Sequence, residues 1–214
     1  VGKIGANLEK LREMRKKAAE EGADLILTSE LYTCGYPPED LVRKPQFISS
    51  LRSAVEAFAS ETSDGGPAVL LGTPWVESNR LHNSLVLIEG GAITTARHKY
   101  DLPNYGVFDE KRVFDPGPMP GPISFKDVRI GVPICEDIWT PEVVECITET
   151  GGEIILVPNG SPFEAGKRDM RVHHAVARVV ESKRPLVYLN QIGGQDELVF
   201  DGASFIMNAD RTIS

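Results

Sequence analysis

The sequence is poor in cysteine and in long hydrophobic runs, and each shortage excludes a class of protein. Its 214 residues hold three cysteines, and this low, odd number argues against a disulfide framework and for a reducing compartment. No apolar run approaches the ~20 residues of a membrane-spanning helix. The N-terminal residues Val1–Gly5 lack the apolar stretch of a signal peptide. We therefore expect a cytoplasmic protein with no membrane partner.

Basic residues are also in short supply. Lysine and arginine number 23 against 31 acidic residues, which gives a formal net charge of −8. A negative field repels phosphate backbones, so nucleic acid is not expected as a partner. The hydrophobic and charged fractions, 41% and 25%, are typical of globular proteins. With no repeat, low-complexity tract or internal linker, the sequence predicts one domain over residues 1–214.

The hydrophobic pattern alternates between helical and strand periods, which predicts an α/β fold. A helix is expected from Asn7 to Glu21, followed by a short buried strand from Leu25 to Thr28. Gly90-Gly91 lies between two strand-like segments and predicts a hairpin turn. Since hairpins interrupt the alternation, we expect mixed sheets with helices on their outer faces. Further helices are expected at 46–61, 141–150 and 169–183, and further strands at 68–72, 84–88, 92–96, 128–134, 153–157, 186–190 and 203–207.

Cys135 is the strongest chemical candidate among the three cysteines. It ends an apolar strand, and the chain turns polar at once with Glu136. Strand ends in α/β folds place side chains at the mouth of a crevice. A free cysteine is more often a small buried hydrophobe, and we expect that role for Cys146, on the apolar face of a helix. Cys34 lies in a loop and fits either interpretation.

A thiol nucleophile needs a base, because the thiolate is the reactive form. The adjacent pair His173-His174 lies on a predicted helix, so its two rings point to different faces, which is unlike a metal site. Nothing else in the sequence supports a histidine base, although one stays possible. The four histidines are His82, His98, His173 and His174.

Two charged residues at strand ends offer another base and a cation. Glu30 directly follows the strand that begins at Leu25, and Lys99 ends the second arm of the hairpin. Each alone is more typically a solvated charge. Together with Cys135, a glutamate base and a lysine that stabilises an oxyanion suit attack on an amide carbon.

The order Glu30, Lys99, Cys135 resembles the Glu-Lys-Cys triad of the nitrilase superfamily. Longer segments narrow the resemblance to the glutamine-hydrolysing domain of glutamine-dependent NAD synthetases, and the similarity covers essentially the whole chain. The segments that carry it are Ser29–Leu41, Lys99–Glu110, Gly131–Trp139, Asn159–Glu164 and Asn190–Glu197.

The resemblance implies an αββα sandwich with two central mixed sheets and helices on the outer faces. It implies hydrolysis of L-glutamine to glutamate and ammonia through a cysteine thioester. The ammonia would pass to a C-terminal synthetase domain in cis, which amidates deamido-NAD with ATP and Mg. The glutamine-hydrolysing domain itself needs no cofactor or metal, and the family implies a homo-oligomer. The family's first strand, expected before Val1, and the synthetase domain with its Ser-Gly-Gly-type loop do not occur in these residues.

The resemblance also assigns roles to single residues. Glu30 would be the general base, Lys99 the oxyanion stabiliser and Cys135 the nucleophile. Glu110 resembles a second glutamate that organises the triad, and the backbone N–H of Glu136 would add an oxyanion donor. The residues implied for the glutamine pocket are Tyr36, Tyr105, Glu136, Ser161 and Phe163, although ordinary packing also accounts for the aromatic ones.

Two other interpretations of the chain stay open. One is a free-standing nitrilase-type amidase or carbamoylase that acts on another amide. The other is a catalytically silent interaction module of the same fold, which has no chemical need for all three triad residues. Outside the triad, the pair Lys167-Arg168 is expected at a solvated surface or an interdomain contact.

Overall fold

The computed structural model describes all residues from 1 to 214, and the chain falls into two compact units. Unit 1 comprises residues 1–97 and 103–115, and unit 2 comprises residues 98–102 and 116–214. Each unit has its own mixed sheet and its own pair of helices. The prediction that residues 1–214 form one domain stays a prediction.

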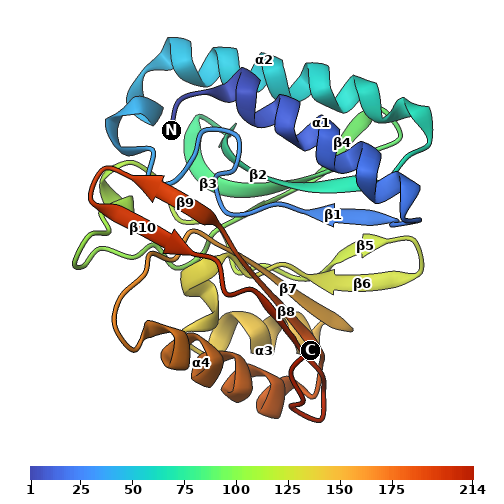
Figure 1. The fold of residues 1–214 in the computed structure, drawn as a ribbon, viewed down its shortest axis with the longest axis vertical. Coiled ribbons are helices and arrows are strands. Elements are labelled where there is room, and N and C mark those ends of the chain that lie inside the picture. Colours follow the sequence, from blue (N-terminus) through green and yellow to red (C-terminus); the bar gives the residue numbers. More distant parts are fainter. The chain divides into compact units, whose positions relative to one another are not determined.

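Unit 1 is built on a four-stranded sheet in the order β1-β2-β3-β4. β1 runs parallel to β2, and β3 runs antiparallel to β2. Figure 1 shows α1 and α2 side by side on one face of this sheet. The elements are α1 (Ile4–Glu20), β1 (Leu25–Leu27), α2 (Pro45–Glu61), β2 (Ala68–Glu77), β3 (Arg80–Glu89) and β4 (Ala92–His98), with short 3-10 turns η1 (Glu39–Arg43), η2 (Thr62–Asp64) and η3 (Glu110–Arg112).

Strands β2 and β3 form a hairpin twice as long as the sequence predicts. Their pairing continues to Glu77 and Arg80, and the two turn residues Ser78 and Asn79 have φ values of 48° and 61°. Left-handed conformation at both turn positions matches the twist of the flanking strands. The sequence prediction stopped short because Pro74 and the polar residues Thr73, His82 and Asn83 interrupt the apolar pattern, although all of them are buried.

A partly buried ion pair between Arg15 and Asp64 joins helix α1 to the segment before β2, in addition to apolar contacts. Its buried residues Leu8, Leu11 and Arg15 recur every three or four positions, which places them on one helix face. The Arg15 guanidinium donates to both carboxylate oxygens of Asp64 at 2.7 and 2.8 Å, and its Nε donates to the Pro67 carbonyl at 2.8 Å. A bidentate pair fixes direction as well as distance.

The turn that follows β1 packs directly against β2 at Gly72. A Cβ atom at Gly72 would lie 2.1 Å from the Ser29 carbonyl oxygen and 2.8 Å from the Leu31 nitrogen. The Gly72 N–H donates to the Thr28 hydroxyl at 2.8 Å. Leu31 itself is left-handed, with φ 48°. The close approach of two backbones therefore fixes the position of Glu30, which lies between Ser29 and Leu31.

Unit 2 is built on a five-stranded sheet in the order β11-β8-β7-β6-β5. The three central strands are parallel, and the two edge strands are antiparallel to their neighbours. Figure 1 shows α3 and α4 on the same face of this sheet. The elements are β5 (Ile123–Phe125), β6 (Val128–Gly131), η4 (Cys135–Ile138), α3 (Glu142–Glu149), β7 (Ile154–Asn159), α4 (Lys167–Ser182), β8 (Leu186–Asn190), β9 (Ile192–Gln195), β10 (Leu198–Asp201) and β11 (Phe205–Met207), with β9 and β10 paired as a separate hairpin.

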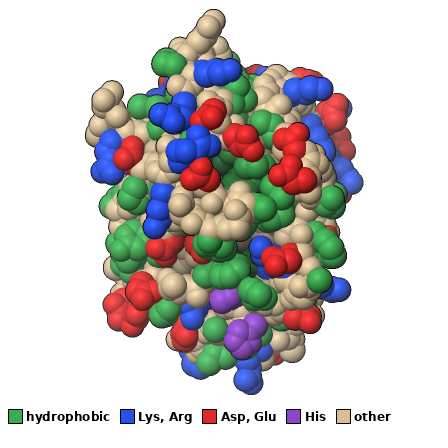
Figure 2. All heavy atoms as spheres, turned by 90° about the vertical axis from the view of Figure 1, so that its left-hand side faces the viewer, with side chains coloured by type: hydrophobic (Ala, Val, Ile, Leu, Met, Phe, Trp, Pro, Cys, Tyr) green, Lys and Arg blue, Asp and Glu red, His purple; other side chains and the backbone are tan.

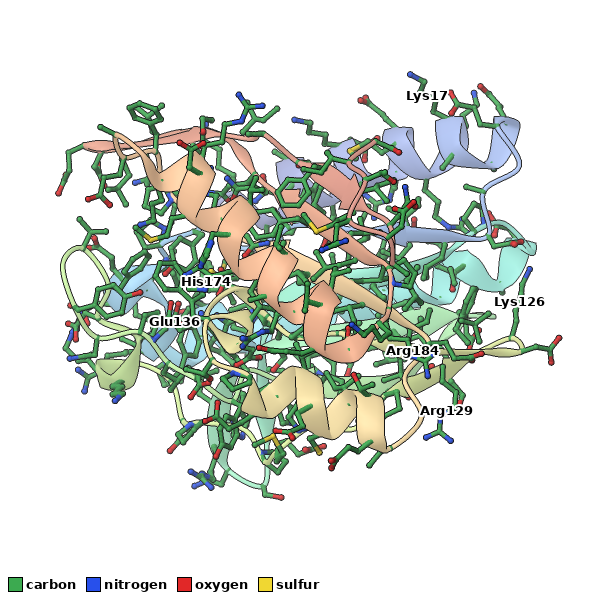
Figure 3. All side chains as sticks on the ribbon, turned by 90° about the horizontal axis from the view of Figure 1, so that it is seen from below. Lys17, Lys126, Arg129, Glu136, His174 and Arg184 are labelled. Carbon is green, nitrogen blue, oxygen red and sulfur yellow. The ribbon has the colours of Figure 1, made fainter.

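The core of unit 2 lies between its sheet and the two helices. Gly131 ends β6 where a Cβ atom would lie 2.4 Å from Ile147 of α3, so only glycine allows this helix to pack so closely. Arg129 near the start of β6 and Arg184 just before β8 lie at the opposite end of the unit from Glu136 (Figure 3). The buried cluster comprises Ile138, Val143, Val144, Ile147, Ile155, Val157, Ala175, Val179, Leu186, Tyr188 and Met207.

The predicted class of mixed sheets with helices on their faces is confirmed in both units. The predicted helices agree with the observed ones to within three residues at each end. The short strands β5, β9 and β10 were not predicted. β9 and β10 are mostly exposed, with Ile192 85% and Val199 59% accessible, so they carry no alternating apolar face for a sequence to reveal.

The surface shows no segment suited to a bilayer and no single-sign patch on the face drawn in Figure 2. No helix combines the length and the apolar composition that crossing a membrane requires. On the face that Figure 2 shows, lysine and arginine side chains are interspersed with aspartate and glutamate.

Replacing Gly72 by alanine tests the close approach at the Glu30 turn. The added Cβ meets backbone atoms of Ser29 and Leu31, so we expect Gly72→Ala to lower the free energy of unfolding by about 1–3 kcal/mol. Gly5→Ala in α1 is the matched control, because nothing lies within 4 Å of its Cβ position. Thermal unfolding midpoints measure both changes. Equal midpoints for Gly72→Ala and Gly5→Ala would contradict the close approach.

Candidate active site

Unit 1 brings two of the predicted glutamates together on one asparagine. Asn83 of β3 donates from Nδ2 to Glu30 Oε1 at 2.8 Å and to Glu110 Oε2 at 3.2 Å. The Tyr36 hydroxyl donates to Glu110 Oε1 at 2.8 Å. All four side chains are buried, and Glu30 and Asn83 are fully inaccessible. We refer to Glu30, Tyr36, Asn83 and Glu110 as the glutamate cluster.

Charge explains the orientation of the Asn83 amide. A buried carboxylate is stable only where hydrogen bonds replace its lost hydration. An amide nitrogen has two hydrogens, and here one serves each glutamate. The reversed amide would point its oxygen at two carboxylates. The buried Asn83 Oδ1 instead has no hydrogen-bond partner, so the amide gives up one acceptor bond to serve both acids.

A hollow of about 220 Å³ in unit 1 opens beside the glutamate cluster. Tyr36 and Glu110 line it, and the ring of Phe108 lies 5.4 Å from that of Tyr105 in an edge contact. Tyr105 is 47% exposed, so it lies at the surface near the hollow rather than in the core. The full lining is Tyr36, Pro37, Pro38, Glu39, Val107, Phe108, Asp109, Glu110, Arg112, Val113 and Phe114.

A larger apolar groove in unit 1, of about 500 Å³, holds none of the predicted site residues. Its walls come from η1, α2 and the β2–β3 hairpin. Arg52 on its rim stacks on Trp75, with its guanidinium carbon 3.6 Å from the ring centroid, and pairs with Glu56. Pocket size therefore does not single out the predicted residues, two of which, Tyr36 and Glu110, line the smaller hollow.

Cys135 of unit 2 begins the turn η4, four residues after the end of β6. It is 5% exposed and left-handed, with φ 48°. For a residue with a Cβ atom this conformation is disfavoured, and such strain is concentrated at functional sites. The turn closes through N–H donation from Asp137 to the Ile134 carbonyl at 3.1 Å and from Trp139 to the Glu136 carbonyl at 2.9 Å. Glu136 is half-buried.

Lys99 directly follows β4 and is fully buried. Its carbonyl accepts the Gly117 N–H at 2.7 Å, and a Cβ atom at Gly117 would lie 2.5 Å from His98. The segment that carries Lys99 therefore runs against the proline- and glycine-rich stretch that begins at residue 116. A buried lysine requires anionic or polar partners, and this burial separates Lys99 from the solvated lysines of the surface.

Ser161 and Phe163 lie on the loop that follows β7. The buried side chains of Asn190 and Arg171 form hydrogen bonds to this loop. Asn190 accepts the Ser161 N–H at 2.9 Å and donates to its carbonyl at 3.0 Å. The Arg171 guanidinium donates to the Ser161 hydroxyl at 3.1 Å and to its carbonyl at 2.9 Å. Ser161 is buried, whereas Phe163 is 61% exposed. The loop backbone is thus rigid, and the exposed ring is not part of the core.

The prediction of a solvated position is wrong for Lys167, whereas an interdomain contact stays a prediction. We expected the pair Lys167-Arg168 at a solvated surface or an interdomain contact, but Lys167 is only 6% exposed and lies 3.5 Å from the carboxylate of Glu164. It is the first residue of α4, where the chain turns back from the loop. Arg168 is exposed, as expected.

The remaining cysteines differ from Cys135 in their surroundings. Cys34 is fully buried, its thiol donates to the carbonyls of Leu31 and Gly35, and burial raises the pKa of that thiol well above its usual range. It is therefore a packing residue, which settles the interpretation that the sequence left open. Cys146 is half-buried on α3.

The two histidines of α4 face different surroundings, as their adjacency predicts. His173 is exposed, and His174 is half-buried with its ring stacked 4.5 Å from that of Trp139. Burial lowers the pKa of His174, and the charges of Arg178 and His173 act in the same direction. No group of three or more histidine, cysteine, aspartate or glutamate side chains is close enough to hold a metal ion.

The sequence did not identify four residues that hold the predicted ones, namely Asn83, Asp137, Arg171 and Asn190. Asn83 had little signal of its own, because it stands between His82 and Ser84 in the polar part of β3. Asp137 lies two residues after Cys135, within the segment Gly131–Trp139, but no local pattern assigns it a role. That Glu30 of unit 1 and Lys99 and Cys135 of unit 2 act on one substrate stays a prediction.

Comparison with known proteins bears on the whole chain. A synthetase from Rhodobacter capsulatus, a glutamine-dependent NAD(+) synthetase, is 41% identical over 214 residues, which are all of this chain and 39% of that protein. The chain thus spans about two fifths of the length of such relatives. This match over the whole chain confirms the predicted resemblance to glutamine-dependent NAD synthetases.

Solved structures share the fold. That of the glutamine-dependent NAD+ synthetase from Acinetobacter baumannii, a complex with ADP, has a TM-score of 0.93 at 35% identity over 100% of this chain and 40% of that one. An amidase from Nesterenkonia sp. AN1, with acrylamide added at its active site cysteine, has a TM-score of 0.84 at 27% identity over 98% of this chain and 82% of that one. The predicted nitrilase-like fold class is confirmed.

The family model described as carbon-nitrogen hydrolase matches residues 2–214. It covers both units, with the glutamate cluster, Lys99 and Cys135 inside the match. The chain therefore belongs to the carbon-nitrogen hydrolase family.

Proposed function

We propose that this chain hydrolyses L-glutamine to glutamate and ammonia, with Cys135 as the nucleophile. The strongest support is the 41% identity over the whole chain with a glutamine-dependent NAD(+) synthetase, against 27% with the amidase from Nesterenkonia. The amidase still supports a nucleophilic cysteine, because mutants of it carry acrylamide or the acetamide moiety of fluoroacetamide bound at the active site cysteine.

In the proposed reaction, Glu30 takes the proton of the Cys135 thiol, and the thiolate attacks the carboxamide carbon of glutamine. Lys99 and the backbone N–H of Glu136 stabilise the oxyanion of the tetrahedral intermediate. Glu30 then returns the proton to the leaving nitrogen, ammonia departs and a thioester remains. Water, activated by Glu30, attacks the thioester, so glutamate leaves and the thiol is restored.

The glutamate cluster suits this double use of Glu30. A base that takes and returns a proton must keep one position through both steps. The side-chain amide of Asn83 donates one hydrogen bond to Glu30 and another to Glu110. Glu110, fixed in turn by Tyr36, organises the base. Tyr105, Ser161, Phe163 and Glu136 are proposed to contact the glutamine, together with Tyr36.

In the full-length protein we propose that the ammonia serves a synthetase domain in cis. That domain would amidate deamido-NAD to NAD with ATP and Mg, and the ADP complex of the synthetase from Acinetobacter baumannii fits such a nucleotide site. The glutamine-hydrolysing chain itself is proposed to need no cofactor. A homo-oligomer in the cytoplasm is proposed for the complete protein.

Replacing Cys135 by alanine in the full-length protein separates the two half-reactions. Without the thiol, glutamine releases no ammonia at this site, whereas a synthetase site still accepts ammonia from added ammonium salts. We expect NAD formation to be lost with glutamine and kept with ammonium, and the same split for Glu30→Ala and Lys99→Ala. Cys34→Ala and Cys146→Ala are controls that keep glutamine use. Glutamine-dependent synthesis by Cys135→Ala would refute the nucleophile, and circular dichroism monitors folding.

Alkylation of the Cys135 thiol distinguishes three possibilities for this chain. These are glutamine hydrolysis, hydrolysis of another amide, and a catalytically silent interaction module. We expect iodoacetamide to modify Cys135 first and glutamine, but not acetamide, to protect it, as peptide mass spectrometry reports. Cys34 should stay unmodified in the folded protein, because its thiol is buried with a raised pKa. Protection by acetamide alone would favour a general amidase, and an inert Cys135 would favour the silent module.

Asn83→Leu tests the glutamate cluster. Leucine has a similar volume but no donor, so the two carboxylates lose their shared hydrogen bonds and repel each other. We expect kcat/KM for glutamine to fall at least about tenfold, with ammonium-dependent synthesis unchanged. The exposed Asn208 provides the control Asn208→Leu, which should behave as wild type. A normal glutamine rate in Asn83→Leu would show that the glutamates need no bridge.

A further inference from the structure

Asp137 is a buried carboxylate that the proposed reaction does not use. It lies in η4, two residues after Cys135, and is 1% exposed. Its Oδ2 accepts the N–H of Ile134 at 2.9 Å. Its Oδ1 accepts the N–H of Tyr100 at 3.1 Å and the N–H of Asp101 at 2.8 Å. One carboxylate thus binds two chain segments that are far apart in the sequence.

The donors stand next to the two reacting residues of unit 2. Ile134 immediately precedes Cys135, and Tyr100 immediately follows Lys99. The Ile134 bond closes the turn that holds Cys135 in its left-handed conformation. The bonds to Tyr100 and Asp101 fix the backbone just beyond Lys99. Any shift of one segment against the other breaks at least one of these three bonds.

The ionised carboxylate accepts all three bonds best, because both of its oxygens are then acceptors only. A protonated acid turns one oxygen into a donor, which would then face a backbone N–H. Burial raises the pKa of Asp137 to about 7, while the N–H donors of Asp101 and Ile134 and the charge of Lys99 hold it down. Buried ionisable groups with shifted pKa values are concentrated at functional sites.

We propose that Asp137 is a positioning residue that holds the backbones of Lys99 and Cys135 in the one register in which oxyanion stabiliser and nucleophile serve the same amide. This inference rests on the proposed function. In this proposal the carboxylate acts through the backbones of the two segments and not on the substrate itself. A displacement of about 1 Å in such a pair is enough to reduce turnover by about a hundredfold.

The sign of the pH dependence follows from the ionised form. As pH falls through about 7, Asp137 gains a proton. Its hydrogen bonds to the N–H groups of Ile134, Tyr100 and Asp101 then weaken, and kcat falls. The other ionisable groups near Asp137 are Lys99 and Asp101 in the segment directly after β4, and Cys135 and Glu136 in its own turn. From α4, His174 faces the turn through Trp139.

The test compares Asp137→Asn with wild type in the full-length protein. We expect glutamine kcat to fall at least about tenfold with KM changed by less than about twofold, because substrate contacts remain. Ammonium-dependent synthesis should persist. The acid limb of kcat near pH 7 should disappear, since asparagine does not titrate. Asp127→Asn, on the exposed β5–β6 turn, is the matched control and should match wild type.

Each outcome decides the matter. A kcat within about twofold of wild type in Asp137→Asn, or a reduced kcat with an unchanged acid limb, overturns the positioning role. If Asp137→Asn does not fold, the pH profile of the wild-type protein is the test. A wild-type kcat that is constant between about pH 5 and 9 contradicts a positioning role for ionised Asp137. A wild-type kcat that falls on the acid side near pH 7 supports it. Wild type that releases no ammonia from glutamine refutes the proposed function instead.

Discussion

The burial of ionisable side chains is the constraint on which the rest of this structure depends. Glu30, Lys99 and Asp137 are at most 1% exposed, and Glu110 is 4% exposed. A charge removed from water persists only where hydrogen bonds or opposite charge replace hydration. The partners that meet this need, Asn83, Tyr36 and the backbone N–H groups around Asp137, therefore have fixed positions. Rigidity around the reacting groups is a consequence of charge burial rather than a separate property.

The same local design occurs once in each unit. In unit 1 an apolar strand ends, Leu31 turns the chain with φ 48°, and Glu30 stands beside it. In unit 2 another apolar strand ends, and Cys135 itself has φ 48°. The Glu30 turn packs against Gly72, which admits no Cβ atom, whereas Gly131 packs against Ile147 and Ile155 and not against the Cys135 turn. Close packing of two backbones thus supports the left-handed residue beside Glu30.

The sequence carried enough information for the helices, the central strands and the triad candidates, because apolar runs mark strands and a polar residue at a strand end stands out. It carried little about residues whose importance lies in a contact. Asn83 and Glu110 are 27 positions apart, and Asp137 and Tyr100 are 37 apart. No local pattern encodes such a meeting, since it arises from the topology of the sheet. The sequence did not predict that Lys167 is buried, for the same reason.

Solvent exposure explains why the sequence did not predict β9 and β10. A strand is read from sequence by its apolar alternation, and β9 and β10 carry apolar residues that point to solvent, such as Ile192 and Val199. The missed parts of β2 and β3 are mostly buried instead, and there the polar residues Thr73, His82 and Asn83 interrupt the apolar pattern. Hydrogen bonding between backbones, which leaves no trace in side-chain chemistry, supports these segments.

The place of Asn83 in β3 has a consequence for the chemical ageing of the protein. Asparagine followed by serine, as here with Ser84, is prone to spontaneous deamidation when the backbone is free to cyclise onto the side chain. Pairing of Asn83 with Pro74 and of Ser84 with Thr73 keeps this stretch extended, and the amide hydrogens are engaged by Glu30 and Glu110. Deamidation would set a third carboxylate between two others. The β2–β3 ladder therefore protects the molecule's working lifetime.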